Sequence, residues 1–108
     1  MTEVWKCGGT LMILNAKKII VTGGASGIGR AVCVIAAREG ADIAVADINP
    51  EMAEETVALV REQNREAIIV EMDTSKRLDA ERMVKETVAA FGTIDGIVCG
   101  AIKLVPGK

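Results

Sequence analysis

Short apolar runs alternate along this chain with longer stretches in which apolar residues recur at a helical spacing. Each run holds five or six residues, many of them β-branched. Such runs are typical of strands that are buried on both faces of a parallel sheet. The pattern therefore predicts four strands, at residues 18–22, 42–46, 67–71 and 94–99.

Three amphipathic helices are predicted between these strands, at residues 28–38, 50–63 and 79–91. Asn49 and Pro50 suit the N-cap and the first position of the second helix. Gly40 and Gly92 follow the other two helices, where a left-handed residue is favoured. The residues that share the predicted apolar face of each helix are, in chain order, Ile28, Val32, Ile35 and Ala36; Ala53, Val57 and Val60; and Ala80, Val84, Thr87, Val88 and Phe91.

This alternation of strands and helices predicts an α/β fold. Right-handed crossovers between the strands produce a parallel sheet with helices on both faces. Residues 17–108 are expected to form one domain, because no linker or shift in composition divides them. Residues 1–16 are expected to be a poorly ordered lead-in.

The composition narrows the classes of function. Half of the 108 residues are hydrophobic, 26% are charged and the formal net charge is −2, which fits a soluble globular domain. The balanced charge, with one Trp, one Phe and no Tyr, predicts no basic or aromatic surface for nucleic acid. The apolar run at residues 11–14 is too short for a signal peptide or a membrane span, so we expect a cytoplasmic protein without membrane contact.

The cysteines give no sign of a metal site. Cys7, Cys33 and Cys99 are far apart in the sequence, and the chain has no histidine. The paired ligand spacing of zinc sites is therefore missing, and we expect no bound metal. An odd, scattered number of cysteines favours free thiols in a reducing compartment.

A glycine-rich segment, TGGASGIG at residues 22–29, joins the first strand to the first helix. Gly23 can make the sharp exit from the strand, Gly27 lets a pyrophosphate approach the backbone, and Gly29 lets the helix pack closely on the sheet. The free N–H groups of the first helical turn, including that of Ile28, point at such an anion, and the Ser26 hydroxyl can add a hydrogen bond. The position of the segment predicts a dinucleotide site rather than an ordinary turn.

Asp47 ends the second strand, eighteen residues after Gly29. This is close to the offset of about 20 residues expected for an acid that binds the adenosine ribose. Its carboxylate can accept hydrogen bonds from both ribose hydroxyls and would repel a 2′-phosphate. Ser26 offers no counter-charge, and only Arg30, if its side chain turned back, would partly offset Asp47. The predicted cofactor is therefore NAD rather than NADP.

Polar or small residues also follow the third and fourth strands. Asp73 and Thr74 can reach the adenine edge of the dinucleotide, or they can cap the following turn, and the sequence leaves both interpretations open. Cys99 and Gly100 end the fourth strand across the topological switch point from the first strand. The absence of bulky side chains at Gly100 and Ala101 leaves room there for the cofactor.

These motifs together resemble the N-terminal half of the short-chain dehydrogenase/reductase family, over about residues 14–101. TGGASGIG resembles its cofactor fingerprint, VADIN the NAD-selective end of its second strand, MDTS its adenine-contact segment and FGTIDGIV the run into its fourth strand. The resemblance implies a Rossmann-type fold, here with strand order 3-2-1-4. It also implies hydride transfer between a nicotinamide and an alcohol or carbonyl substrate, and assembly into dimers or tetramers.

Two features depart from the family pattern. The family's fourth strand ends in Asn-Asn-Ala-Gly, where this chain has Cys-Gly-Ala-Ile. The Ser, Tyr and Lys that perform the family's chemistry have no counterpart, because the chain has no tyrosine and no serine after the fourth strand. General acid–base catalysis needs a group within reach of the reacting oxygen, so we assign no catalytic residue and expect no turnover by this chain alone.

Three interpretations of the function stay open. The one that the sequence favours is a truncated or frame-shifted member of an oxidoreductase family. The second is a stand-alone, non-catalytic NAD-binding module or interaction partner. The third is a product that does not fold stably alone, in which the bare apolar edge of the fourth strand pairs with another chain or forms a homo-oligomer.

Overall fold

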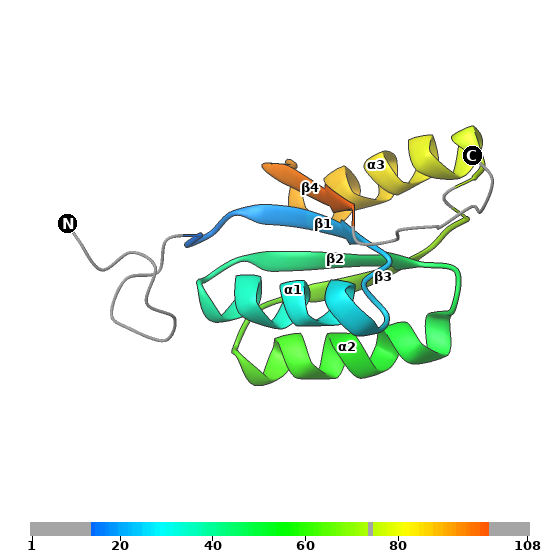
Figure 1. The fold of residues 1–108 in the computed structure, drawn as a ribbon. Coiled ribbons are helices and arrows are strands. Elements are labelled where there is room, and N and C mark those ends of the chain that lie inside the picture. Colours follow the sequence, from blue (N-terminus) through cyan, green and yellow to red (C-terminus); the bar gives the residue numbers. More distant parts are fainter. Residues whose placement is uncertain (1–13, 74, 100–108) are drawn as a thin grey trace.

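The computed structural model describes residues 14–73 and 75–99 (Figure 1). All seven predicted elements are present, and their ends differ from the predicted ends by two residues or fewer. The predicted lead-in at residues 1–16 lies mostly outside the described residues. In chain order the elements are β1 (Lys18–Thr22), α1 (Gly27–Arg38), β2 (Asp42–Asp47), α2 (Pro50–Glu62), β3 (Ala67–Glu71), α3 (Arg77–Phe91) and β4 (Gly96–Cys99).

The four strands form one parallel sheet in the order β3-β2-β1-β4, which confirms the predicted fold class. Ile20 of β1 is in register with Ala44 of β2 on one side and with Ile97 of β4 on the other. The chain therefore runs from β1 outward to β3 and then crosses back to β4. This reversal places the topological switch point between β1 and β4, and ligands of open α/β sheets bind at the carboxyl ends of strands at such a point.

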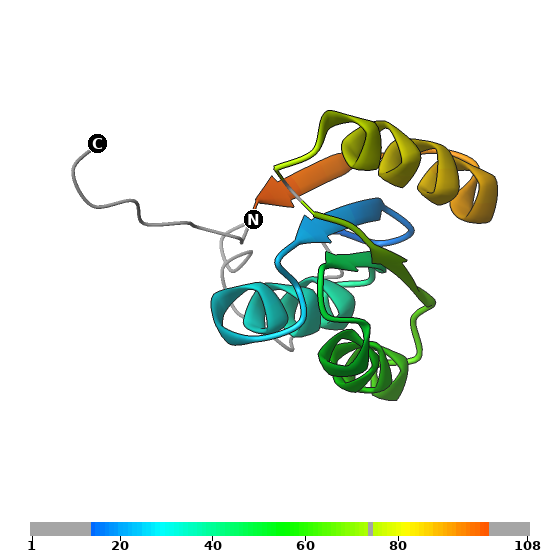
Figure 2. The same ribbon diagram turned by 90° about the vertical axis from the view of Figure 1, so that its right-hand side faces the viewer.

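Helices cover both faces of the sheet: α1 and α2 lie on one face and α3 lies on the other (Figures 1 and 2). Successive residues of a strand point to opposite faces. Ile43 and Val45 of β2 accordingly belong to the core beneath α1 and α2, whereas Ala44 and Ala46 belong to the core beneath α3. Burial on both faces explains why β1 and β2 read as continuous apolar runs.

The face of α1 that packs on the sheet differs from the predicted one. Ile28 and Ile35 are exposed and Val32 is partly buried, so the prediction was wrong for both isoleucines. Small side chains let a helix approach a sheet closely and gain dispersion contacts along its whole length, which favours the small face over the bulky one. The buried residues of α1 are Gly29, Cys33, Ala36 and Ala37.

The buried face of α2 is the predicted one, with Ala53, Val57 and Val60 all buried. Its N-cap is also as predicted, because Asn49 Oδ1 accepts a hydrogen bond from the Met52 N–H at 3.1 Å. The apolar spacing and the cap residue were therefore sufficient to predict how this helix is placed.

The predicted stripe of α3 is confirmed in part, because Thr87 is buried and Ala80 and Phe91 pack against the core cluster beneath the helix. Met83 and Thr87 are buried, while Val84 and Val88 are exposed. Met83 packs in the same cluster as the alanines of β2, whose small side chains leave space beneath the helix that a long, unbranched methionine can fill. The helix ends where predicted, at Gly92, which adopts a left-handed φ of +87°.

β4 forms one edge of the sheet, and three of its four residues are exposed. Ile97 and Val98 are among the large exposed apolar side chains. The pairing of this edge with another chain stays a prediction. Within residues 14–73 and 75–99, no helix is long and apolar enough to cross a membrane, and no three His, Cys, Asp or Glu side chains are grouped to hold a metal ion.

Candidate dinucleotide-binding site

Residues 23–26 form a turn between β1 and α1, here called the glycine turn. Gly23 leaves β1 with a φ of +70°, and its N–H donates to the carbonyl oxygen of Ala46 at 2.7 Å. α1 then begins at Gly27, which has a φ of +59°. Both values lie in the left-handed region that favours glycine. Gly23 therefore makes the sharp exit from the strand, as predicted.

Two further glycines let α1 and β2 lie against the glycine turn. A Cβ atom on Gly29 would lie 2.6 Å from the carbonyl carbon of Gly23 and closer still to its oxygen. A Cβ atom on Gly24 would lie 3.1 Å from both Cys33 Sγ and Val45 Cγ1. The close packing predicted at Gly29 thus occurs against the glycine turn itself. The tight surroundings of Gly24 were missed, because the motif spacing does not include it.

The first residues of α1 face the solvent. Ser26 is the N-cap, and it is exposed together with Gly27 and Ile28. The Ser26 side chain makes no capping hydrogen bond, and the first turn of α1 holds no acidic residue. Backbone N–H groups in a first helical turn lack intrahelical partners, and the helix dipole favours an anion there. The start of α1 can therefore accept a phosphate group without competition from a carboxylate of the same turn.

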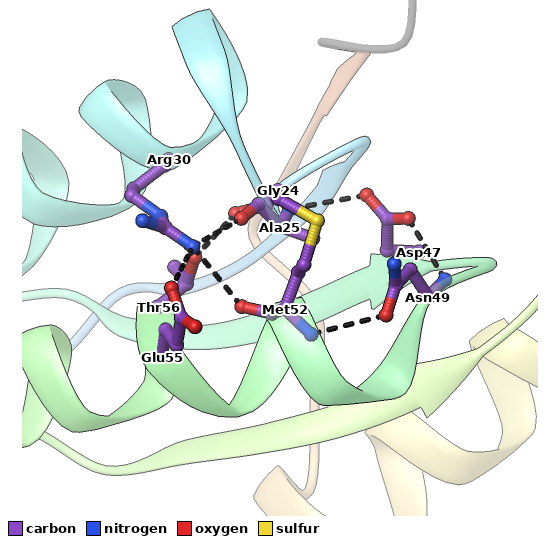
Figure 3. A network of polar contacts seen from close by, with 8 residues as sticks. All are labelled: Gly24, Ala25, Arg30, Asp47, Asn49, Met52, Glu55 and Thr56. Atoms are coloured by element: carbon purple, nitrogen blue, oxygen red, sulfur yellow. Dashed lines mark hydrogen bonds and ion pairs between the residues drawn. The ribbon is translucent and has the colours of Figure 1, made fainter.

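Asp47 faces the glycine turn from the end of β2 (Figure 3). Its Oδ2 accepts a hydrogen bond from the Ala25 N–H at 3.1 Å, and its Oδ1 accepts one from the Asn49 N–H at 3.0 Å. A carboxylate offers about four acceptor positions. Since the side chain is only partly buried, these two bonds leave acceptor capacity on the solvent side. The structure thus brings the predicted acid and the predicted turn together.

Arg30 lies on the other side of the glycine turn from Asp47 (Figure 3). Its Nη2 is 2.6 Å from the carbonyl oxygen of Ala25, 3.2 Å from that of Met52 and 3.1 Å from Glu55 Oε1. The guanidinium therefore turns toward α2 and has acceptors there. Arg30 therefore does not turn back toward Asp47, and its charge is not paired with the Asp47 carboxylate.

A hollow of about 380 Å³ opens at the carboxyl ends of β2 and β3, where Ile48 and Asp73 are among its lining residues. Asp73 Oδ1 accepts hydrogen bonds from the Ser75 N–H at 2.9 Å and from the Ser75 hydroxyl at 2.7 Å. Asp73 therefore caps the turn after β3, which is one of its two predicted roles. Its contact with an adenine stays a prediction, and Thr74 lies outside the described residues.

Cys99 ends β4 in register with Thr22, the last residue of β1. The Thr22 hydroxyl donates to the carbonyl oxygen of Val98 at 3.4 Å and adds a side-chain bond between the two strands. The carboxyl ends of β1 and β4 therefore meet at the switch point, beside the glycine turn. Cys99 is exposed there, and Gly100 lies outside the described residues.

The strand, the glycine turn, the helix and Asp47 all lie within a segment that matches a known protein family. Residues 17–103 match the family model described as short chain dehydrogenase. The chain belongs to the short-chain dehydrogenase family.

Curated members of the family include close relatives of this chain. An oxidoreductase of Thermotoga maritima is 40% identical over 90 residues, which is 83% of this chain and 35% of that protein. The 2,5-dichloro-2,5-cyclohexadiene-1,4-diol dehydrogenase of Sphingobium indicum is 45% identical over 83 residues, which is 77% of this chain and 32% of that protein. The chain thus spans about a third of the length of these relatives.

Solved structures of short-chain dehydrogenases have the same fold. An NAD⁺-bound xylitol dehydrogenase superimposes with a TM-score of 0.76 and is 35% identical, covering 79% of this chain and 33% of its own. A carveol dehydrogenase from Mycobacterium avium in complex with NAD gives a TM-score of 0.77 at 30% identity, covering 82% of this chain and 36% of its own. Proteins of this family therefore bind nicotinamide dinucleotides on the fold seen here.

Sequence reasoning also missed Thr56, whose side chain contacts the glycine turn. Its side chain is fully buried on the face of α2 that carries Ala53, Val57 and Val60, and its hydroxyl donates to the carbonyl oxygen of Gly24 at 2.8 Å. The sequence did carry a signal for this contact, because Thr56 is a polar residue on an otherwise apolar helix face. A buried hydroxyl group needs a hydrogen-bond partner.

The two described cysteines of this chain differ in environment. Burial raises the pKa of the Cys33 thiol from an ordinary value of 9.0 to about 12, although the charge of Arg30 opposes the shift. Its thiolate is then roughly a thousandfold scarcer at neutral pH than that of an ordinary cysteine, because each pKa unit is a factor of ten. Cys33 therefore behaves as a small buried apolar residue, whereas Cys99 is exposed.

We expect a disulfide reagent to modify Cys99 rapidly in the folded protein and Cys33 only after unfolding. The measurement is the number of thiols titrated with and without urea, in a Cys7→Ser background so that two thiols remain. A Cys99→Ser variant is the control, and it should lose the fast phase alone. Rapid modification of Cys33 in the folded protein would contradict the buried, protonated thiol.

Proposed function

We propose that this chain binds NAD as the cofactor-binding part of a short-chain dehydrogenase-type oxidoreductase. The observation that carries the proposal is the pair formed by Asp47 and the glycine turn, which are joined by the 3.1 Å hydrogen bond from the Ala25 N–H. A diphosphate at the start of α1 and a ribose at Asp47 are two neighbouring groups of one dinucleotide. The turn and the acid therefore fit the ADP half of the cofactor.

The preference for NAD over NADP is part of the proposal. A 2′-phosphate would lie close to the Asp47 carboxylate, and like charges at such a distance repel strongly in a partly desolvated site. Arg30 could have provided a counter-charge, but its guanidinium is engaged with Glu55 and with backbone carbonyls on the α2 side. The charge of Asp47 therefore acts on the ribose position without compensation from Arg30.

The remaining predicted contacts complete the proposed binding mode. The hollow beside Asp73 and Ile48 fits the adenine ring, with Thr74 next to it in the sequence. The cofactor then crosses the start of α1, over Ser26 and Gly27, toward the ends of β1 and β4, where Cys99 lies. Gly100, which follows Cys99 in the sequence, keeps its predicted role as a proposal. Each of these proposed roles is inferred from where the residue lies in the fold or in the sequence.

Bound NAD supplies a hydride acceptor, which is the chemistry of the family. For the whole protein we propose hydride transfer between the nicotinamide and an alcohol or carbonyl substrate, in line with the names of its relatives. The 108 residues contain no tyrosine, so for them alone we propose binding of the cofactor without turnover. We place this function in the cytoplasm, where thiols such as those of Cys33 and Cys99 remain free.

Titration with NAD and NADP tests the role of Asp47. We expect the Asp47→Ala variant to bind NAD at least about tenfold more weakly than the wild type, because hydrogen bonds to a charged group contribute about 1.5–3 kcal/mol each. The Asp47→Asn variant keeps an oxygen for the Ala25 N–H but carries no charge. Its ratio of NADP to NAD dissociation constants should therefore fall about tenfold, a step that corresponds to about 1.4 kcal/mol.

The control is Glu62→Ala, which removes an exposed carboxylate from the far end of α2 and should leave both dissociation constants unchanged. Isothermal calorimetry on the purified chain gives all of these values. Equal NAD affinity for the wild type and Asp47→Ala would refute the ribose assignment. Wild-type protein that binds neither dinucleotide would refute the proposed function itself.

A further inference from the structure

Side chains from α1 and α2 hold the backbone carbonyls of the glycine turn (Figure 3). The carbonyl oxygen of Gly24 accepts from the Thr56 hydroxyl at 2.8 Å, and that of Ala25 accepts from Arg30 Nη2 at 2.6 Å. Arg30 Nε also donates to Thr56 Oγ1 at 3.0 Å, so the two side chains act as one unit. We call this unit the Arg30–Thr56 clamp.

The position of Thr56 is unusual for a helix residue. Its side chain is 0% exposed, and a buried threonine in a helix ordinarily bonds to a carbonyl of its own helix. Here the hydroxyl reaches out of α2 instead, donating to the glycine turn and accepting from Arg30. The polar group is therefore satisfied entirely by contacts that fix the turn.

Arg30 is suited to its part of the clamp by geometry rather than by charge alone. Its planar guanidinium presents donors in a fixed fork, so one side chain can reach Thr56, Ala25 and the carbonyl of Met52 together. Glu55 adds an ion pair at 3.1 Å, but its side chain is mostly exposed, and such pairs contribute little. The contacts of Arg30 with the backbone carbonyls and with Thr56 are therefore the ones that hold the glycine turn in place.

The clamp sets the direction of two peptide groups. In a planar trans peptide the C=O and the following N–H point in opposite directions. The peptide between Gly24 and Ala25 is held at both ends, because Thr56 binds its oxygen and Asp47 binds its N–H. In the next peptide Arg30 binds the Ala25 oxygen, which directs the Ser26 N–H away from the guanidinium.

We propose that Arg30 and Thr56 are positioning residues that preset the glycine turn for a diphosphate ligand. Without the clamp, the peptide between Ala25 and Ser26 is free to rotate and to turn its carbonyl oxygen, instead of the Ser26 N–H, toward the ligand. A carbonyl oxygen repels a phosphate that an N–H would bind. This inference rests on the proposed function for its ligand, and on the hydrogen bonds alone for its effect on the turn.

The test combines ligand binding with amide exchange in Thr56→Val and Arg30→Met. Each variant removes polar contacts with little change in side-chain size. We expect the dissociation constants of NAD and of ADP, which carries the same diphosphate, to rise about fivefold, the loss typical of one hydrogen bond. In the ligand-free protein, the Ala25 amide should exchange about fivefold faster by NMR, whereas the Ile43 amide in the sheet should exchange at the wild-type rate.

Three matched variants separate positioning from general stability. Thr56→Ser keeps the hydroxyl and should restore wild-type binding and exchange, and Arg38→Met removes an exposed arginine from the last turn of the same helix as Arg30 without effect. If Thr56→Val does not fold, Arg30→Lys gives the same comparison, because an ammonium group cannot present a planar fork of donors. It should bind NAD more weakly and speed exchange at Ala25.

Wild-type binding and wild-type exchange at Ala25 in both clamp variants would overturn the inference. Equal acceleration at Ala25 and Ile43 would also overturn it, because the side chains would then support only the general stability of the fold. Failure of the wild-type protein to bind NAD or ADP would overturn the proposed function instead. In that case the exchange rates alone would test whether the clamp holds the turn in place.

Discussion

Replacing Gly29 by alanine is expected to lower the free energy of unfolding by about 3 kcal/mol, at the upper end of the range for overpacked sites. The added Cβ would lie 2.6 Å from the carbonyl carbon of Gly23 and 3.0 Å from Gly24 Cα. These are backbone atoms, so no side chain can rotate away to relieve the overlap. Either α1 must move away from β1, or the glycine turn must change shape.

Both of these responses displace the peptide groups proposed to bind the diphosphate. We therefore expect Gly29→Ala to reduce NAD affinity at least about tenfold under conditions where most of the protein is still folded, in keeping with the sensitivity of a phosphate site to backbone position. Urea unfolding followed by circular dichroism measures the stability, and calorimetry measures the affinity.

Two other glycines are matched controls for Gly29. A Cβ atom on Gly96 would have no described atom within 4 Å, and its φ is not positive, so Gly96→Ala should change stability by less than about 0.5 kcal/mol. Gly27 has equally open surroundings but a φ of +59°, so Gly27→Ala should cost about 1 kcal/mol through backbone strain alone. A cost at Gly29 no larger than the cost at Gly27 would contradict the close approach of α1 to the glycine turn.

The Asp42→Asn variant is expected to lose about 2 kcal/mol of stability at pH 7, because hydrogen bonds to a charged group contribute about 1.5–3 kcal/mol. The carboxylate is almost fully buried at the start of β2, where it pairs with the Lys18 ammonium and with Arg65 Nη2 at 2.9 Å. It also accepts from the Glu66 N–H at 3.0 Å. Neutralising it leaves two cations facing each other without their shared partner.

The loss should depend on pH in a defined direction. Burial alone would raise the pKa of Asp42, but the hydrogen bonds from Lys18 and Glu66 and the charges of Arg65 and Lys18 outweigh burial and hold the pKa below its usual range. In the acidic range below about pH 4, the unfolded chain therefore binds a proton before the folded protein does. The stabilisation is complete above that range and is lost as the pH falls through the folded-state pKa.

Urea titrations of wild type and Asp42→Asn at pH 7 and at successively lower pH measure this difference. It should shrink on acidification, whereas the exposed Glu62→Gln should show no comparable difference at either pH. NAD affinity should stay unchanged in Asp42→Asn at pH 7, because Asp42 begins the strand that Asp47 ends. A difference that grows on acidification would contradict the charge cluster as its cause.

The strands and the nearness of Asp47 to the glycine turn could be predicted because each depends on local signals, whereas the strand order followed from the family resemblance. The run Lys18–Thr22 ends at a glycine, and Asp47 follows at the distance that one helix and one strand require. The offset between Gly29 and Asp47 corresponds to one crossover in a parallel sheet. The sequence alone therefore predicts that the acid lies beside the turn.

The clamp and the face of α1 could not be predicted in this way. Arg30 and Thr56 are 26 residues apart on different helices, and their contact depends on how closely α1 and α2 lie against the same face of the sheet. That closeness depends in turn on the small buried residues Cys33 and Ala37. A search for hydrophobic periodicity gives such residues less weight than isoleucine, and it therefore favoured the wrong face of α1. The cluster around Asp42 also joins residues from three separate segments, and no local pattern marks it.

The two hydrogen bonds that the Asp47 carboxylate accepts from the Ala25 and Asn49 N–H groups have a consequence for the kinetics of ligand binding. The carboxylate is immobilised during folding, so the entropy of fixing it is not lost again in the association step. We therefore expect the association rate constant for a dinucleotide to be the same in the wild type and in variants of the ribose contact. Their differences in affinity should emerge as shorter residence times of the complex, visible in stopped-flow displacement.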